Sequence, residues 1–444
     1  MSKQLVQIGM DDIDSPEGGC TTHFASLLVE RLNKKNVEWM DYPNLVRLNP
    51  GIPYRTRGNG AVALRFRIDQ NEVASLSEMV EDLIHNYVDN EYPNTNPGVV
   101  FLFNEIPEKV RDLANLSLWR VVPIELAQRL ITRYKIHHYS QGNERGLIGA
   151  LASVANGLSE DYTYEYIAYR SPKDCKEPRR VDAESVLAMN QKMGNRVFSN
   201  IDPGTNRILI EPHGPDPVIF GVRGEKAEYV IEAARQVRSA QQVERWMVFR
   251  TNQGTGEHLK HQVEIKNLRP YMAALVVGRV NSEPRMNEGG HVIFSITDES
   301  GSVDCAAYEP SGEFRETIMK LMVGDHVGVY SGVRPASRTH GLTLNLEGIE
   351  VKELAKATEL SNPLCPNCGK RMKSAGHGKG FKCTKCGLKD TEIAKIETVV
   401  KREFQVGFYL PPARAQRHLT RPLVRLGKAN SGKSSRLVAK WCSN

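Results

Sequence analysis

The sequence lacks a long apolar run: no segment approaches the roughly 18 residues that a membrane-spanning helix needs. Its first acidic residues, Asp11, Asp12 and Asp14, come before the apolar core of a secretion signal could form. Aromatic residues make up only 7% of the chain, but the apolar (40%) and charged (25%) fractions are those of a globular protein. This composition excludes fibrous and disordered proteins. We therefore expect a cytoplasmic protein, and its 444 residues predict about two to four domains.

The eight cysteines do not form the pattern of a disulfide framework. Four are scattered along the chain, at Cys20, Cys175, Cys305 and Cys442. The other four form two Cys-x-x-Cys pairs separated by fourteen residues, Cys365, Cys368, Cys383 and Cys386. This spacing predicts a zinc ribbon in which four thiolates close a tetrahedral, structural Zn²⁺ site. The alternative, a pair of redox-active motifs, lacks the surrounding βαβ pattern of thioredoxin-like proteins.

Positive charge is concentrated near the carboxyl end. From Leu360 onward there are 18 lysines and arginines against 4 acidic residues, whereas residues 1–359 carry 41 against 48. A basic module beside a mildly acidic body is typical of proteins that bind a polyanion, most often nucleic acid. The alternative is a basic tail that serves solubility only.

An all-β region precedes the cysteine pairs. Turn residues separate five predicted strands, and residues 313–322 form a helix between the third and the fourth strand. Five strands with this helix fit an OB fold, a barrel that commonly binds single-stranded nucleic acid, although other small barrels share the pattern. The predicted strands are residues 272–280, 291–297, 302–308, 326–333 and 342–351.

The amino-terminal region carries the residues suited to chemistry. A predicted strand, Gln4–Gly9, is followed by Asp11, Asp12 and Asp14, and a helix begins near Thr21 behind two glycines. Clustered carboxylates suit Mg²⁺, and a helix start suits phosphate oxygens. The alternative is a turn of acids that only cap the helix.

Two further stretches are rich in arginine and glycine. Residues 47–60 contain three arginines, two asparagines and three glycines, and lead into a strand at residues 61–68. Arg145 and Gly146 stand at the start of an apolar helix. Both stretches suit anion contacts, but either is also compatible with a structural turn. The segment Gly427–Ser434 matches the phosphate-loop pattern, with Lys433 at the position of the conserved lysine of that motif. It lacks the surrounding sheet that a phosphate loop needs, so we interpret it as a basic, flexible tail that touches RNA phosphates.

Taken together, these motifs resemble the archaeal tRNA(Ile) agmatidine synthetases over nearly the whole chain. The resemblance rests on their order and on the two trailing modules. The motifs are Gly9-Met-Asp-Asp-Ile-Asp14, Gly19-Cys-Thr-Thr22, Arg47-Leu-Asn-Pro50, Thr56-Arg-Gly-Asn-Gly60, Arg145-Gly-Leu-Ile-Gly-Ala150 and Gly221-Val-Arg-Gly-Glu225. One departure is Ile13, where the family usually carries Thr.

The resemblance implies a ligase that forms a carbon–nitrogen bond. It would condense agmatine with the 2-position of the wobble cytidine in a tRNA(Ile) with the anticodon CAU, through phosphorylation of the base oxygen, using ATP and Mg²⁺. The expected Zn²⁺ is structural and lies in the ribbon. No obligate protein partner is expected. The implied fold is multidomain, α/β plus β. It comprises a kinase-like domain (1–66 and 137–200), a ferredoxin-like α+β domain (67–136 and 201–258), the OB fold (268–353), the zinc ribbon (360–390) and a basic tail contacting tRNA (391–444).

The predicted site residues fall into four groups. The catalytic group is Asp11, Asp12, Asp14 and Thr21. The three aspartates are also the expected Mg²⁺ ligands, and the resemblance implies that Thr21 is the phosphorylated residue. The ATP-binding group is Gly18, Gly19, Cys20, Thr22, Arg57, Asn59, Arg145 and Gly146. Agmatine needs a carboxylate for its guanidinium, and the predicted group is Asp202, Arg223 and Glu225, with Asp202 preferred. The RNA-binding group is Lys370, Arg371, Lys379, Lys382, Arg414, Arg417, Arg421 and Arg425.

Two other functions stay open at the level of sequence. The chain could be a non-enzymatic binder of single-stranded nucleic acid, with the amino-terminal acids acting only as helix caps. It could also be a Mg²⁺-dependent phosphatase or nuclease, which clustered carboxylates also allow. Neither alternative would consume agmatine.

Overall fold

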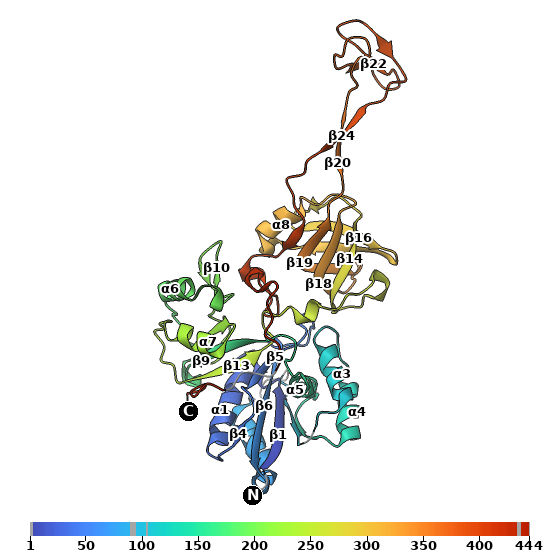
Figure 1. Cartoon of the computed structure of the whole chain (residues 1–444). Coiled ribbons are helices and arrows are strands. Elements are labelled where there is room, and N and C mark those ends of the chain that lie inside the picture. Colours follow the sequence, from blue (N-terminus) through green and yellow to red (C-terminus); the bar gives the residue numbers. More distant parts are fainter. Residues whose placement is uncertain (1–2, 89–94, 104, 433–436, 444) are drawn as a thin grey trace.

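The computed structural model describes residues 3–88, 95–103, 105–432 and 437–443. Figure 1 shows three parts: an α/β body at the amino-terminal end, a β-barrel beside it, and a thin arm that ends in a small β module. Within the described ranges, no helix has both the length and the apolar composition to cross a membrane.

A nine-stranded mixed sheet forms the centre of the body. The strand order is β12-β9-β13-β5-β6-β1-β7-β8, and β4 also pairs with β6. Only β5 and β13 pair in parallel; the other pairs are antiparallel. The strands are β1 (Lys3–Asp11), β4 (Glu38–Trp39), β5 (Asn44–Arg47), β6 (Gly60–Asp69), β7 (Gly98–Leu102), β8 (His137–Ser140), β9 (Thr163–Tyr169), β12 (Val218–Gly224) and β13 (Arg245–Thr251).

Seven α-helices accompany this sheet in the described part of the body. They are α1 (Thr21–Asn33), α2 (Ala74–Tyr87), α3 (Glu108–Ser117), α4 (Ile124–Tyr134), α5 (Gly146–Ala155), α6 (Ala183–Met193) and α7 (Ala227–Ala234). Helix α5 packs on β1, β6 and β7, and α7 packs on β9, β12 and β13. Along β1, Val6, Ile8 and Met10 are fully buried and alternate with Gly9 and Asp11, which face α5. The first strand therefore delivers Asp11 to the start of α5.

The predicted elements of the body are largely confirmed. The strand at residues 4–9, the helix near Thr21, the strand at 61–68 and the helix after Arg145 all form. One continuous sheet includes strands from both predicted amino-terminal domains, so the boundaries between them stay a prediction.

The barrel confirms the predicted OB-type arrangement. Its order is β14-β18-β19-β17-β16, and a pairing of β14 with β16 closes it. The short helix lies between β17 and β18, as the sequence predicted. The elements are β14 (Ala273–Val280), β15 (Arg285–Met286), β16 (Val292–Asp298), β17 (Gly301–Ala307), α8 (Glu313–Ile318), β18 (His326–Arg334) and β19 (Thr343–Glu353).

The arm extends from the end of β19. Strands β20 (Ala357–Ser361) and β24 (Ile396–Val400) pair as an antiparallel two-stranded ribbon that leads out to the module and back. The module itself contains three two-residue strands, β21 (Lys373–Ser374), β22 (Phe381–Lys382) and β23 (Lys389–Asp390). We call residues 357–400 the arm.

The residues after the arm return to the body, and we call residues 407–432 and 437–443 the returning segment (Figure 1). Strand β25 (Gly407–Tyr409) pairs with β19 of the barrel. Further on, Trp441 is 7% exposed and lies in the core of the body, and its carbonyl accepts a hydrogen bond from Val248 of β13. The prediction of a flexible tail is therefore wrong for the described residues. Lys433 and Ser434 of the phosphate-loop-like pattern lie outside them.

Candidate active site and zinc centre

The three predicted aspartates lie at the carboxyl end of β1. Asp11 ends the strand, and its carboxylate lies against the backbone of α5, where a Cβ added to Gly149 would stand 1.8 Å from Asp11 Oδ2. Asp12 has a left-handed backbone (φ +56°) and accepts hydrogen bonds from Thr56 Oγ1 (3.4 Å) and Asn96 Nδ2 (3.3 Å). Only glycine at position 149 leaves room for the Asp11 carboxylate in this place.

Burial and mutual repulsion both act on these carboxylates. Burial, followed by the charge of Asp12, raises the pKa of Asp11 well above its ordinary value. Burial and the charge of Asp14 raise the pKa of Asp12 from 3.8 to about 6. Burial also raises the pKa of Asp14, although Arg57 opposes the shift. The charged forms of Asp11 and Asp12 would therefore be stabilised by a bound cation.

Thr21 is the first residue of α1 and is 4% exposed. The residue at the N-cap is Cys20, and its side chain makes no capping hydrogen bond. The Thr21 hydroxyl oxygen instead accepts a hydrogen bond from the backbone N–H of Ile13 (3.4 Å). The hydroxyl therefore faces the acidic loop, a position that a simple helix cap would not require.

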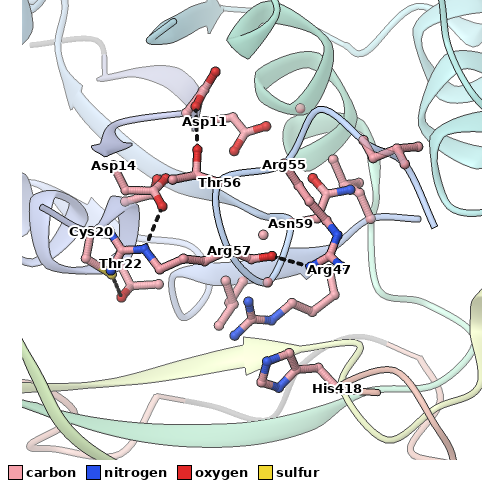
Figure 2. Close-up of a pocket in the computed structure, with 18 of the residues that line it drawn as sticks. Asp11, Asp14, Cys20, Thr22, Arg47, Arg55, Thr56, Arg57, Asn59 and His418 are labelled. Carbon is pink, nitrogen blue, oxygen red and sulfur yellow. Dashed lines mark hydrogen bonds and ion pairs between the residues drawn. The ribbon is translucent and has the colours of Figure 1, made fainter. Parts of the chain in front are cut away.

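Arg57 holds the loop between β1 and α1 in place. Its Nε donates to Asp14 Oδ2 (3.0 Å), and its Nη2 donates to the carbonyls of Ser15, Gly18 and Gly19 (3.1, 3.0 and 2.6 Å). Its Nη1 lies 3.1 Å from Asp216 Oδ2. Figure 2 shows the Asp14–Arg57 contact. Because these contacts occupy the guanidinium, Arg57 holds the loop between β1 and α1 in a fixed conformation.

These residues line a cavity of about 850 Å³. Its volume lies toward the upper end of the roughly 300–1,000 Å³ that is usual for ligand pockets. The cavity reaches from the acidic loop across the sheet to β9 and β12. The predicted residues that line it are Asp11, Asp12, Asp14, Cys20, Thr21, Thr22, Arg57, Asn59, Arg145 and Arg223.

The wall opposite the acidic loop is basic. Arg47, Arg55 and Arg223 line it, together with His418 of the returning segment. Figure 2 shows His418 apart from Asp11 and Asp14. The Nε of Arg47 is buried without a hydrogen-bond partner among the described residues, and burial lowers the pKa of Arg47. The cavity therefore offers carboxylates at one end and donors for an anion at the other.

Five residues of the predicted catalytic, ATP-binding and agmatine-binding groups are absent from the lining. Gly18, Gly19 and Gly146 support it through the backbone; Gly19 has φ +69° and Gly146 packs against Asn96 and Gly98. Asp202 is 1% exposed and accepts from Arg414 (2.7 Å), and Glu225 accepts from Arg425 (2.7 Å).

The predicted agmatine site therefore needs correction. The carboxylates of Asp202 and Glu225 already pair with arginines, so they do not offer a free partner for a guanidinium. Arg223 lines the cavity, but its positive charge would repel the guanidinium of agmatine.

Sequence analysis missed four cavity residues that the structure brings together: Glu165, Glu211, Asp216 and His418. Glu165 had a recognisable pattern, because it is the one carboxylate in β9, a strand whose residues are all buried. A buried carboxylate in an apolar strand needs a partner. The other three lie in irregular segments without periodicity that could have identified them.

The zinc ligands converge as predicted. The sulfurs of Cys365, Cys368, Cys383 and Cys386 lie within 4.8 Å of one another. The Sγ–Sγ distances are 3.5 Å for Cys365–Cys386 and for Cys368–Cys383. Two thiolates bound at about 2.3 Å to one tetrahedral ion lie roughly 3.8 Å apart, so the four residues fit Zn²⁺. Elsewhere in the described residues, three or more ligand atoms do not gather this closely.

The predicted RNA-binding residues divide into two groups. Lys370, Arg371, Lys379 and Lys382 are exposed on the zinc ribbon, and Arg417 is exposed on the returning segment. Arg425 is 0% exposed and pairs with Asp161 and Glu225, so its prediction as an RNA contact is wrong. Arg414 and Arg421 are likewise engaged, with Asp202 and Asp161. Their pairing holds the returning segment on the body.

A charged cavity in an α/β body, joined to an OB-type barrel and a four-cysteine ribbon, defines a class of multidomain enzymes that act on nucleic acid. Four family models match the chain: the TiaS TCKD domain (residues 7–74), the TiaS FLD domain (144–258), the OB-fold nucleic acid binding domain (274–352) and the TiaS C-terminal zinc ribbon domain (362–404). The FLD match includes residues 144–200, which the sequence analysis assigned to the kinase-like domain.

Curated proteins and solved structures agree with these matches. The chain is 41% identical to the tRNA(Ile) 2-agmatinylcytidine synthetase TiaS of Staphylothermus marinus over 96% of this chain and 95% of that protein. It is 42% identical to the protein of the same name from Archaeoglobus fulgidus, over 95% and 97%. The chain belongs to the tRNA(Ile) 2-agmatinylcytidine synthetase family, TiaS. The crystal structure of a complex of TiaS with its isoleucine tRNA and ATP is similar, with a TM-score of 0.85 and 39% identity over 97% of this chain and 99% of that one.

Proposed function

We propose that this chain is an ATP-dependent ligase that joins agmatine to the 2-position of the wobble cytidine in an isoleucine tRNA with the anticodon CAU. The observation that carries the proposal is the likeness to a crystal structure described as a complex of TiaS with its isoleucine tRNA, AMPCPP and agmatine. That likeness has a TM-score of 0.82, with 37% identity over 97% of this chain and 99% of that one. The cavity adds a physical argument, because it combines an acidic loop with a basic wall.

The chemistry requires activation of the base. The oxygen at the 2-position of cytosine belongs to a urea-like group and is a very poor leaving group, so an amine displaces it only after it becomes a phosphate ester. Phosphoryl transfer asks a protein mainly for positioning and for charge neutralisation. A cavity with carboxylates at one end and arginines at the other suits that task.

Asp11 and Asp12 are the residues of the acidic loop that fit Mg²⁺. Burial and then a neighbouring carboxylate raise the pKa values of both, so a bound cation would stabilise their charged forms, whereas Asp14 is already paired with Arg57. Mg²⁺ in nucleotide sites usually takes one or two carboxylates and completes its shell with phosphates and water. The predicted role of Asp14 therefore becomes the fixing of the loop through Arg57.

Thr21 is the proposed phosphoryl acceptor on the protein. Its hydroxyl lies beside the acidic loop at the start of a 13-residue helix, where the helix dipole favours added negative charge. Thr21→Ala should leave a folded, tRNA-binding protein with severely reduced agmatidine formation and no protein-bound phosphate. Thr21→Ser keeps a hydroxyl and should retain product formation. Near-normal yield in Thr21→Ala would rule out this role.

Glu211 is the proposed partner of the agmatine guanidinium. Of the cavity carboxylates outside the acidic loop, Glu165 pairs with Arg223, and Asp216 pairs with Arg57 and Arg179. Glu211 makes no hydrogen bond or ion pair with a described residue. Glu211→Gln should therefore raise the KM for agmatine at least tenfold and leave the KM for ATP nearly unchanged. Glu244→Gln, at an exposed carboxylate outside the lining, is the matched control.

The overall proposal is tested by product analysis. The protein is incubated with ATP, agmatine and an isoleucine tRNA carrying a CAU anticodon, and the mass of the wobble nucleoside is measured. Gain of the mass of agmatine minus water, only when ATP and agmatine are both present, is the expected result. A simple RNA-binding protein would leave the nucleoside unchanged, and a phosphatase or nuclease would act without agmatine.

A further inference from the structure

His418 reaches the cavity from a segment far from the other site residues in sequence. It is accessible from the cavity, and its Nδ1 lies 3.0 Å from Arg223 Nη2. Because a guanidinium only donates hydrogen bonds, Nδ1 is the acceptor, and the ring proton is on Nε2. On the other side, Arg223 Nε donates to Glu165 Oε1 (3.1 Å). One guanidinium is thus held from two sides.

Glu165 is itself firmly placed. It is 3% exposed and also accepts a hydrogen bond from Gln253 Nε2. A Cβ added to Gly221 would stand 2.8 Å from its Oε1, so the small residue at 221 leaves space for the carboxylate. Arg223 Nη1 has no hydrogen-bond partner among the described residues and remains as a donor at the cavity wall.

The backbone around His418 is anchored to the body. The carbonyls of His418 and Leu419 accept hydrogen bonds from the N–H groups of Gly254 (2.9 Å) and Gly256 (2.7 Å). Downstream, Arg421 and Arg425 pair with Asp161. Upstream, β25 pairs with the barrel. The imidazole is therefore held in place by contacts on both sides of it in the chain.

The surroundings keep this histidine neutral. The enclosing protein and then the charges of Arg47, Arg223, Arg55 and Arg417 lower the pKa of His418 well below 6.5. A protonated imidazole could not accept from Arg223, so neutrality and the observed contact agree. The lone pair of Nδ1 is occupied by this contact, which leaves the ring without a free basic nitrogen.

We propose that His418 is a positioning residue that, together with Glu165, orients the Arg223 guanidinium so that its Nη1 binds a phosphate group in the cavity. The phosphate belongs either to the nucleotide or to the RNA. These two sources are the phosphate-bearing substrates of the proposed function, on which this part of the proposal rests. It brings the returning segment into the catalytic site, beyond its role in stability.

The test compares His418→Ala, which removes the acceptor, with His418→Asn, whose amide oxygen takes nearly the place of Nδ1. The KM values for ATP and for tRNA are measured separately, and thermal denaturation checks that the variants are folded. His418→Ala should raise one of the two KM values about tenfold, and His418→Asn should restore it to within about threefold. The KM that moves identifies the source of the phosphate. Unchanged KM values in His418→Ala, or no rescue by Asn, would overturn the proposal.

Two further measurements separate positioning from other roles. In an Arg223→Ala background, adding His418→Ala should cause no further loss, because the group it positions is gone; an additive loss would contradict the proposal. The acid limb of the pH–rate profile should be the same in His418→Asn and wild type, and its loss would indicate a general base instead. Binding of inorganic triphosphate and of tRNA, measured by calorimetry, does not depend on agmatidine formation. It would reveal the weakened phosphate contact even if the proposed reaction failed.

Discussion

The arm and the returning segment are neighbours in sequence and are both rich in cations, but they use their charge differently. On the arm, Lys370, Lys379 and Lys382 are exposed. In the returning segment, Arg425 is fully buried and donates to Asp161, Glu225 and the carbonyl of Gly254. The first set is available to a partner, and the second set is neutralised within the chain.

The difference teaches that a local excess of positive charge is not in itself a binding surface. The planar guanidinium of arginine can donate two parallel hydrogen bonds to one carboxylate, and it is more weakly hydrated, so it is easier to bury. The ammonium of lysine is a compact, strongly hydrated charge. Arg414, Arg421 and Arg425 of the returning segment meet carboxylates of the body, which is mildly acidic. The arm, whose sequence contains these lysines, extends away from that body (Figure 1).

The carboxylates of the body show the same contrast. Asp202 is paired, and Arg414 together with backbone hydrogen bonds lowers its pKa despite the opposing effect of burial. Asp12 has no ion-pair partner among the described residues, and its pKa is raised to about 6. We therefore expect the paired carboxylates to stabilise the fold and Asp12 to act on a ligand.

The largest expected effect is that of Asp12→Asn on activity. Removal of a carboxylate that serves charge neutralisation should reduce ATP turnover by about 1,000-fold or more. The folded-state pKa of Asp12 is above its ordinary 3.8, so its contribution to stability is full below pH 3.8 and is lost as the pH rises through about 6. At pH 7 the Asn variant should therefore melt at or above the wild-type temperature. Turnover assays and calorimetry test both parts, and a lower melting temperature would contradict the assignment of an unpaired carboxylate.

Asp161→Asn should give the largest loss of stability. Asp161 accepts from Arg421 and, through both oxygens, from Arg425, so the change removes the carboxylate partner of Arg421 and leaves the buried Arg425 with Glu225 alone. Breaking a buried pair in this way costs about 3 kcal/mol or more. Denaturant unfolding measures it, with Asp304→Asn as the control, because Asp304 is exposed on the barrel. Equal stability of the two variants would mean that the returning segment is not held by these pairs.

The barrel and the ribbon were predictable because local patterns determine them. Turn residues separate the predicted strands that correspond to β14, β16, β17, β18 and β19. Cys365 and Cys383 begin two pairs whose spacing fits one ion. The acidic loop was likewise predictable because its three aspartates follow one strand. Such features depend on neighbours in the sequence.

The far wall of the cavity was not predictable for the converse reason. His418 meets Arg223 across 195 positions of sequence, and Arg425 meets Asp161 across 264. No periodic pattern in the sequence indicates such contacts. The excess of positive charge near the carboxyl end alone suggested that Arg425 was available to RNA. Long-range pairing of charge, which only the fold reveals, decided which predicted residues belong to the site.

Cys383→Ser should have a smaller effect, confined to the arm. Thiolate coordination supplies the folding energy of a small zinc module, so the ribbon should unfold and tRNA affinity should fall about tenfold to a hundredfold. Hydrolysis of ATP should change far less, because the cavity lies in the body. Metal analysis should find one zinc per chain in the wild type. The paired variant Cys305→Ser, at a buried cysteine of the barrel outside the zinc group, should keep its zinc.

The smallest expected effect is that of single lysines on the arm, and it tests the comparison most directly. If Lys379 contacts an RNA phosphate, Lys379→Gln should weaken tRNA binding only a few-fold and reduce the slope of log affinity against log salt by about 1. Melting temperature should not change, because the exposed lysine makes no ion pair with a described residue. Arg421→Gln should behave in the opposite way, with a lower melting temperature and an unchanged salt slope, because the Arg421 guanidinium forms an ion pair with Asp161. Equal salt slopes for Lys379→Gln and wild type would remove Lys379 from the RNA contacts, and a reduced slope for Arg421→Gln would mean that the returning segment gives up its internal pairs when RNA binds.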